Sequence, residues 1–303
     1  MSSLAVARSP SRARELRALG EALLYLAPSL LIFGVFVFVP LARGVYLSLF
    51  YTNPLGNPTT FAGLDQYAEL FRSAAFRSSL VATLLFALYS VPTSIAVGLG
   101  LAVLGNQRLR GINIFRTLLS STIGVSAAVG ALLWLLLFNP SLGLLNFLLS
   151  LIHLPGPDWL TDPNRAILAV AITTLWLMLG FNVIVLLAGL QGIPEELYES
   201  ARIDGAAGLH TFRHITLPML SPSLFFLLVV DTITVSQAFT QIHLLTRGGP
   251  VDTTRALVYS IYLDGFVNFQ FGFAQAEAFV LFLIILILTA LQFGVLERRV
   301  HYQ

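Results

Sequence analysis

Two residue types are missing from this chain of 303 residues, which has no cysteine and no lysine. Without cysteine it can form no disulfide framework, no cysteine-ligated zinc site and no iron–sulfur cluster. All 17 basic residues are arginine, so the lysine of a phosphate-binding P-loop and the lysine of a Schiff base are absent as well. The chain therefore cannot hydrolyse ATP through a P-loop of its own.

Charge is also scarce. Charged residues make up 11% of the chain and hydrophobic residues 56%, with a mean hydropathy of +0.83. An ordinary soluble domain carries about 25% charged residues, and a soluble protein of this size could not hide so much apolar surface. The composition predicts a polytopic membrane protein.

A helix that crosses a membrane needs about 20 mostly apolar residues. Six stretches satisfy this, and we predict spans at 22–42, 78–104, 118–138, 166–190, 223–245 and 274–293. The uncharged interval that begins at residue 117 is too long for one span and is broken by Asn139-Pro140. We therefore expect residues 142–152 to form a short apolar helix at the membrane interface.

The arginines predict the orientation of these spans. Six crossings place both termini on one side, where the loops and tails hold eleven arginines, whereas the opposite side holds five and Arg43 lies at a span end. Because cytoplasmic segments are enriched in arginine, we expect a cytoplasmic N-terminal segment (1–20), a membrane domain (21–296) and a cytoplasmic C-terminal tail (297–303). The fold class is an all-α polytopic membrane protein with six transmembrane helices, and the loop 191–220 is cytoplasmic.

The connection between the fourth and fifth spans is unusually long and patterned. Pro194 and Glu195-Glu196 are typical of the first turn of a helix, and Asp204-Gly205 predicts a turn. A second short helix is expected over 206–215, which Leu217-Pro218 ends. Helical connections are usually about 2–8 residues, and exposed apolar residues on such a helix–turn–helix favour a docking surface. A solvated connector is the alternative.

The same connection carries a spaced motif. Glu199-Ser200-Ala201 is followed by Gly205, Ile215 and Leu217-Pro218. The pattern resembles the "EAA" motif of permease subunits of binding-protein-dependent ABC importers, with Ser200 where alanine is usual. Stretches at 61–67, 143–146, 187–194, 248–250 and 261–266 are similar to the carbohydrate-uptake group, and 295–303 is most similar to the sn-glycerol-3-phosphate branch. Residues 123–126 depart from the family pattern, since many relatives have a proline entering the third helix.

The resemblance implies a non-catalytic permease subunit of the cell inner membrane. In that family the EAA loop forms a coupling helix that docks on a separate ATP-binding-cassette ATPase dimer, which binds the ATP. A second six-span permease subunit and an extracytoplasmic substrate-binding protein complete the importer. The chain then needs the lipid bilayer but no cofactor, metal or nucleic acid. The implied coupling residues are Glu199, Ser200, Ala201, Asp204, Gly205, Ile215, Leu217 and Pro218.

The predicted fifth span is unusually polar. Asp231, Thr234 and Gln241 share one helical face, and Gln237 lies nearby. An ionisable group within a span usually faces the bundle interior or a water-filled cavity, which suggests a path for a polyol. The alternative is hydrogen bonding between helices. Asn182 in the fourth span is a further candidate for the path.

Other polar residues give weaker signals. His210 and His214 are four apart and could hold a metal, but no third ligand is evident. Glu277 is expected to be an interfacial charge or a partner for an arginine of an outer loop. The helix at 142–152 is expected to pack against the bundle, with contact to the binding protein as the alternative.

Two other classes compete with the importer. An ion-gradient-driven secondary transporter would have several buried carboxylates and internal repeats, and a membrane-embedded enzyme would have clustered histidines and carboxylates. The substrate stays open between a sugar or polyol and sn-glycerol-3-phosphate. The spans predicted at 166–190, 223–245 and 274–293 contain no arginine, which favours a neutral sugar because phosphate favours arginine.

Overall fold

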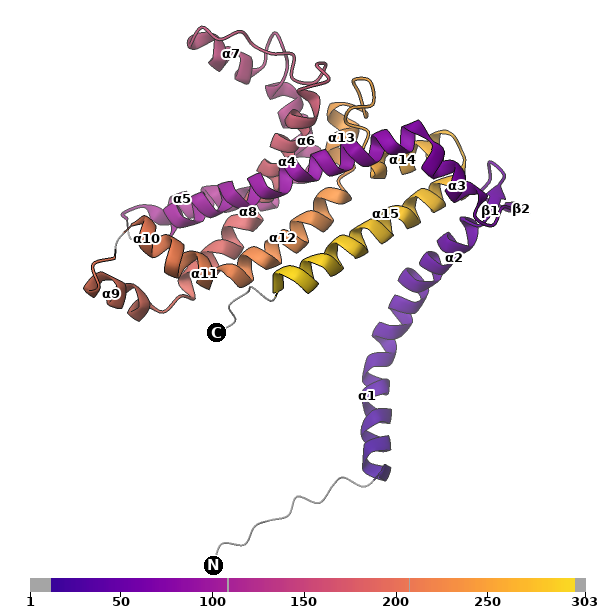
Figure 1. Cartoon of the computed structure of the whole chain (residues 1–303), viewed down its shortest axis with the longest axis horizontal. Helices are drawn as coiled ribbons and strands as arrows, with labels where there is room; N and C mark the ends of the chain where they lie inside the picture. Colours follow the sequence, from indigo (N-terminus) through magenta and orange to yellow (C-terminus); the bar gives the residue numbers. More distant parts are fainter. Residues whose placement is uncertain (1–11, 108, 207, 298–303) are drawn as a thin grey trace, which may run out of the picture.

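The computed structural model describes residues 12–107, 109–206 and 208–297. Helices dominate these residues, and two strands form a small hairpin (Figure 1). In chain order the elements are α1 (Arg12–Phe33), α2 (Val39–Leu47), β1 (Phe50–Thr52), β2 (Pro58–Phe61), α3 (Asp65–Arg72), α4 (Ala74–Gly105), α5 (Ile112–Ser120), α6 (Ala127–Leu137), α7 (Leu144–Leu151), α8 (Ala166–Gln191), α9 (Glu195–Ile203), α10 (Leu209–Thr211), α11 (Leu217–Met219), α12 (Ser221–Ser236), α13 (Thr240–Leu245), α14 (Leu257–Tyr262) and α15 (Phe271–Leu291).

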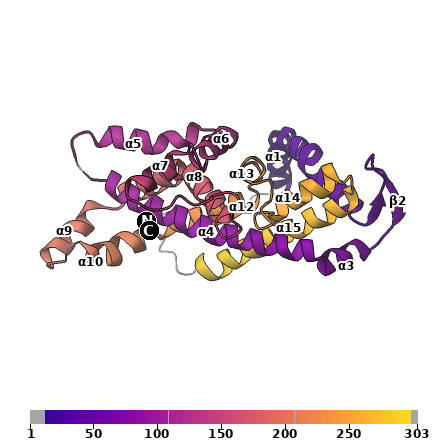
Figure 2. The same cartoon turned by 90° about the horizontal axis from the view of Figure 1, so that it is seen from above.

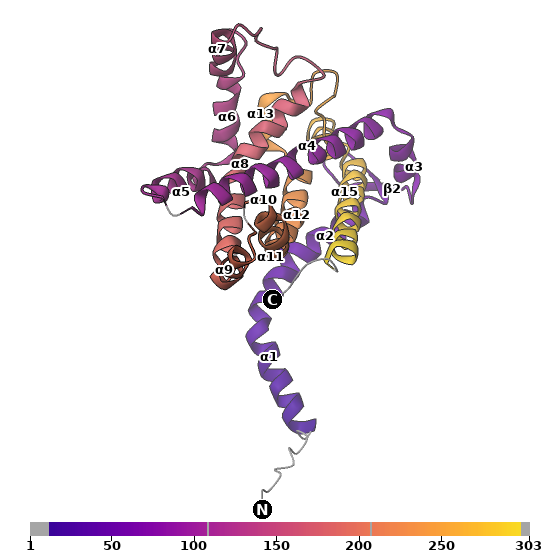
Figure 3. The same cartoon turned by 60° about the vertical axis from the view of Figure 1, so that its left-hand side comes forward.

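The first apolar stretch is a long rod built of α1, a π-helical turn at Gly34–Phe38 and α2. It is apolar enough to cross a membrane over Gly20–Leu47, and its apolar residues are not buried against the rest of the chain. Figures 1 and 3 show α1 standing away from the bundle while α2 joins it. This span therefore meets its own chain only near one end.

A β-hairpin fastens that end of the rod. Gln66 of α3 is buried and donates from Nε2 to the carbonyls of Ser48 and Phe50, at 2.9 and 3.0 Å. Thr52 Oγ1 accepts from the backbone N–H of Gly272 in α15 at 3.0 Å. The stretch at 61–67 thus has a structural role, because its glutamine holds the end of the first span and β1, while Thr52 of β1 joins this region to the last span.

The core is formed by three spans. α4 packs along α8, and α12 packs against both. Gly98 of α4 allows the close approach, since a Cβ there would lie 3.0 Å from the Cβ of Asn182 in α8. Small residues at such contacts are typical of membrane helices. Apolar side chains such as Phe86, Val170 and Val235 fill the space between the three helices.

The third apolar stretch, predicted as one span over 118–138, is not a single helix. It is α5, a 3₁₀ turn at Ser121–Gly124 and α6, bent by 107°. Ser126 adopts an extended conformation and its Oγ accepts from the N–H of Val129 at 3.3 Å, so it starts a new helix as an N-cap. A serine N-cap therefore starts α6 at the bend, within residues 123–126.

The 3₁₀ turn packs directly on the backbone of α8. The N–H of Gly180 donates to Thr122 Oγ1 at 2.8 Å. A Cβ on Gly180 would lie 2.5 Å from that oxygen and 2.9 Å from the backbone nitrogen of Ile123. Glycine is thus required at this contact between α8 and the bent span.

The fifth apolar stretch is also broken. One helix was predicted over 223–245, but α12 ends at Ser236 and α13 starts at Thr240. The helical face predicted to join Asp231, Thr234 and Gln241 therefore does not exist as one stripe. α12 is bent by 64° from the preceding helical segment, Leu209–Met219.

In the described residues, four helices are long and apolar enough to cross a membrane, and two bent pairs raise the number to six if each pair is one span. The helical membrane fold predicted from the sequence is confirmed, with the addition of the hairpin and of α14. α7 lies within the predicted interfacial helix 142–152. The first eleven residues of the N-terminal segment and residues 298–303 of the tail are outside the described residues.

Candidate coupling elbow and buried polar junction

The elbow, Glu195–Met219, connects α8 to α12 and consists of two helical arms. Figure 2 shows α9 and α10 at one end of the molecule and the β-hairpin at the other. The first arm is α9, which directly follows Pro194 and has Glu195 and Glu196 in its first turn and Arg202 in its last. Both ends of α9 therefore carry the charge that the helix dipole favours.

Gly205 closes the first arm. Its φ is +76°, its N–H bonds to the carbonyl of Arg202 at 3.1 Å, and the N–H of Ala206 bonds to the carbonyl of Ala201 at 2.8 Å. These two bonds form a Schellman motif, which needs a left-handed residue at this position. The predicted turn at Asp204-Gly205 is therefore a helix C-cap that only glycine adopts without strain.

The second arm differs from the predicted helix 206–215. It starts at Leu209, after Gly208 at φ +57°, and runs through a π-helical turn at Phe212–Thr216 to Met219. The N–H of Leu217 bonds to the carbonyl of Phe212, five residues back, so the hydrogen-bond register shifts just before Pro218. Leu217-Pro218 consequently does not end the arm. Ala207 lies outside the described residues.

The motif residues divide between the cleft and the surface of the elbow. Ser200, Ala201, Asp204 and Ile215 line a cleft of about 280 Å³ between the arms. Glu199 is exposed on α9, and Gly205, Leu217 and Ile203 are exposed as well, the last at 86%. Pro218 is half-buried where the second arm meets α12. The elbow presents an acidic and apolar surface around its turn.

Apolar packing anchors both arms to the spans. Leu190 and Leu220, at the two ends of the elbow, are buried in one cluster with Leu186 and Leu227. The hydroxyls of Tyr198 and Thr216 are hydrogen-bonded at 3.2 Å, which joins the first arm to the second. The two arms are therefore joined to each other and, through one apolar cluster, to α8 and α12.

Asp231 lies at a polar junction within the core. Its Oδ2 accepts from Ser94 Oγ of α4 and from Asn182 Nδ2 of α8, both at 2.9 Å. All three side chains have zero exposure. The structure thus brings Asp231 and Asn182 together, which favours the interhelical alternative for these two residues. Ser94 was missed from the sequence, although it continues a stripe of small hydroxyl residues on α4.

The other candidates for the substrate path are separate from this junction. Thr234 and Gln237 are exposed on the chain, and Gln241 is buried on α13 at 8% exposure. Because the chain breaks between α12 and α13, these residues point from two different helices. Thr234 lies on a face of α12 that its own chain leaves open, and Gln237 follows directly after the end of that helix.

The structure also places the two histidines and Glu277, the remaining polar candidates from the sequence. The rings of His210 and His214 stack 4.1 Å apart, and no cluster of three metal-ligating side chains occurs in the described part of the chain. Glu277 is buried at 1% exposure rather than interfacial, beside Ser260 and Asp264. Arg255 lies in this group, with Nη2 3.0 Å from Ser260 Oγ and 3.9 Å from Asp264, so its ion pair is with Asp264. The expected pairing of Glu277 itself with an arginine stays a prediction.

The bundle of bent spans and the elbow rooted in two of them define a membrane component of a transporter. The chain belongs to the family of binding-protein-dependent transport system inner membrane components, whose family model matches residues 94–302. The resemblance identified from the sequence is thereby confirmed. The chain is the non-catalytic permease subunit of an ABC importer of the inner membrane, and not an enzyme.

Relatives cover nearly the whole chain. The sn-glycerol-3-phosphate transport system permease protein UgpA of Agrobacterium fabrum is 36% identical over 282 residues, covering 92% of this chain and 95% of the relative. The protein of the same name from Brucella abortus is 37% identical over 280 residues, covering 91% and 94%. A chain of the bacterial alginate ABC transporter, solved with an alginate-bound periplasmic protein, has a TM-score of 0.81 and 24% identity, covering 94% of this chain and 96% of that one. The last comparison shows a shared fold.

Proposed function

We propose that this permease subunit carries a sugar or polyol across the membrane and is driven through its elbow by a separate ATPase dimer. A second six-span permease subunit completes the path, and an extracytoplasmic binding protein delivers the solute. Both termini and the elbow face the cytoplasm. The observation that carries the proposal is the elbow itself, a capped helix–turn–helix with an exposed acidic and apolar surface, rooted in two spans.

The coupling role follows from the elbow's two attachments. Glu199 and Asp204 offer charge-assisted contacts to a basic partner surface, and Ile203 offers an apolar anchor. A partner that moves this surface displaces the ends of α8 and α12 at once, because Leu190 and Leu220 are packed in one cluster. The chain has no nucleotide site of the P-loop type, so the energy arrives through this contact.

The solute path lies on the open side of α12. Thr234 and Gln237 are exposed there and supply hydroxyl and amide groups that suit a polyol. The proposed path also includes Gln241, whereas Asp231 and Asn182 form the wall behind it and hold α12 against α8.

The comparisons favour sn-glycerol-3-phosphate as an alternative substrate. The relatives from Agrobacterium fabrum and Brucella abortus are named for sn-glycerol-3-phosphate. Helices α8, α12 and α15 contain no arginine, which favours a neutral solute in this chain. Uptake of labelled sugars, glycerol and sn-glycerol-3-phosphate by vesicles holding the complete transporter decides between the two.

Reversing one charge tests the coupling role. We expect Glu199→Lys to lower both uptake and solute-stimulated ATP hydrolysis by at least about tenfold, because a charge-assisted contact becomes repulsive. Glu196→Lys is the matched control, since Glu196 is equally exposed on α9 but outside the spaced motif. Normal activity of Glu199→Lys, or uptake by this chain without any ATPase, contradicts the proposal.

A further inference from the structure

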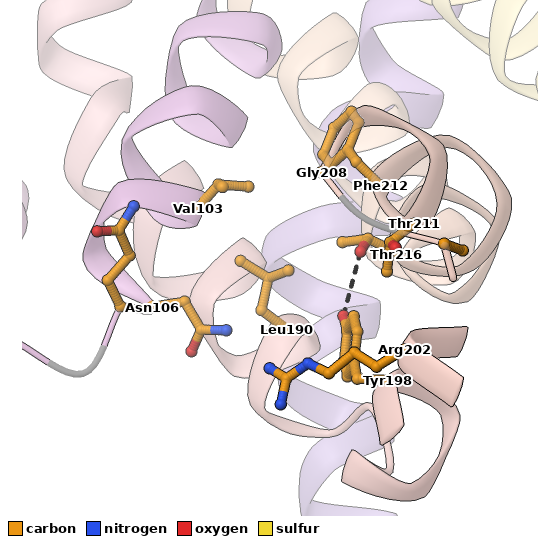
Figure 4. A pocket seen from close by; sticks show the side chains of 11 residues that line it. Val103, Asn106, Leu190, Tyr198, Arg202, Gly208, Thr211, Phe212 and Thr216 are labelled. Carbon is orange, nitrogen blue, oxygen red and sulfur yellow. Dashed lines mark hydrogen bonds between the residues drawn. The ribbon is translucent and has the colours of Figure 1, made fainter. Parts of the chain in front are cut away.

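Two adjoining cavities lie at the base of the elbow, and neither the proposed coupling nor the proposed solute path assigns them a ligand. Their volumes are about 530 and 390 Å³, and both are lined by Asn106, Leu190, Tyr198 and Arg202. Figure 4 looks into the larger one, between the end of α4 and the two arms. The space thus lies between the spans on one side and the elbow on the other.

Two arginines from separate elements border this space. Arg202 of α9 lines both cavities, and Arg116 of α5 lines the second. Arg116 is fixed in place, because its Nε donates to the carbonyl of Gly105 at 2.7 Å. No ion pair between described residues engages either guanidinium. One carboxylate, Glu195, also borders the second cavity, at the N-terminal turn of α9.

The rest of the lining of the larger cavity mixes polar and apolar side chains. Asn106 and Gln107 add amide groups from the end of α4, and Thr211 adds a hydroxyl. Val103 and Leu190 form an apolar wall. Hydrogen-bond donors from three elements therefore converge next to an apolar surface, which suits an anion that carries several acceptor oxygens and an apolar remainder.

We propose that this space binds a phosphate group between Arg202 and Arg116. Guanidinium groups match phosphate oxygens in pairs, and basic pockets between spans on the cytoplasmic side bind lipid headgroups. The phosphate belongs either to an anionic phospholipid of the adjoining leaflet or to a soluble phosphate compound. It bridges α9 to α5 and so joins the elbow to the spans. The inference rests on the proposed function only for the cytoplasmic orientation of the elbow.

The test is a binding measurement on the purified transporter complex, with phosphatidylglycerol and inorganic phosphate as probes. We expect Arg202→Gln and Arg116→Gln each to weaken phosphatidylglycerol binding by about tenfold, in line with the loss of one charged hydrogen bond. Arg202→Lys keeps the charge but loses the paired geometry, so it should weaken binding less than Arg202→Gln does. Arg110→Gln is the matched control, because Arg110 is exposed in the turn just before α5 and lines neither cavity.

The two sources give different results. Phosphatidylglycerol that inorganic phosphate does not displace identifies the lipid headgroup, and binding of inorganic phosphate alone, with the same loss in Arg202→Gln, identifies a soluble ligand. Equal binding of both probes to the unaltered complex, Arg202→Gln and Arg116→Gln overturns the site. The measurement needs no transport, so its failure is distinct from failure of the coupling role.

Discussion

At the scale of single residues, Asp231 shows how a buried acid is accommodated in a span. Its carboxylate is completely buried, and hydrogen bonds from Ser94 and Asn182 hold one of its oxygens. Hydrogen bonds between membrane helices are worth about 0.6 kcal/mol on average and up to about 1.7. The junction is therefore a modest stabilising contact whose main effect is to fix the position of α12 against α4 and α8.

This role predicts a difference between two substitutions. Asp231→Leu leaves the donors of Ser94 and Asn182 unpaired in the core, and we expect it to destabilise the protein by about 1–3 kcal/mol. Asp231→Asn keeps an acceptor oxygen and should stay close to the original stability. Thermal unfolding of the detergent-solubilised protein measures both. Equal stability of the two variants contradicts the role of the junction.

At the scale of elements, the turn of the elbow depends on one backbone conformation. Gly205 has φ +76°, and no heavy atom lies within 4 Å of a Cβ placed there. A side chain at position 205 would therefore strain the backbone but would not clash with neighbouring atoms. A left-handed conformation costs an L-residue other than glycine about 1–2 kcal/mol, and asparagine tolerates it better than alanine.

We predict that Gly205→Ala reduces uptake by several-fold because it weakens the cap and changes the angle between the arms. Gly205→Asn should retain more of the activity, although asparagine is larger. The measurement is the uptake rate at equal amounts of inserted protein. The reverse order of the two variants shows that side-chain bulk at the docking surface, and not backbone strain, decides the effect.

The same scale shows what could be predicted from the sequence. The apolar stretches predict the number of spans, and the spaced motif predicts the elbow and its turn. The breaks at Val125-Ser126 and at residues 237–239 were missed, because an apolar run has the same composition whether it is straight or bent. The structure is needed to show that Ser126 caps α6. It is also needed to show that the bent span packs on Gly180 of α8, where a side chain would clash. The junction of Asp231 with Ser94 was missed because the two are far apart in the chain.

At the scale of the whole molecule, the absence of cysteine makes the orientation directly testable. We predict that a membrane-impermeant thiol reagent labels a Val251→Cys variant in intact cells, whereas a Glu196→Cys variant is labelled only in inside-out vesicles. Both positions are exposed, Val251 at 86%. The unaltered chain is the control, since it has no thiol to react. Labelling of the Glu196→Cys variant in intact cells places the elbow outside and contradicts the coupling role.

The contact between Asn182 and Asp231 also bears on how such proteins diversify. The chain leaves this contact along α8, passes through the elbow and returns to the same contact along α12. The segment between the two residues is therefore a loop whose two ends are held together by this hydrogen bond. We therefore expect an insertion in the elbow itself to leave the contact of α8 with α12 in place, so this loop can change in length or sequence while the core between the spans is kept.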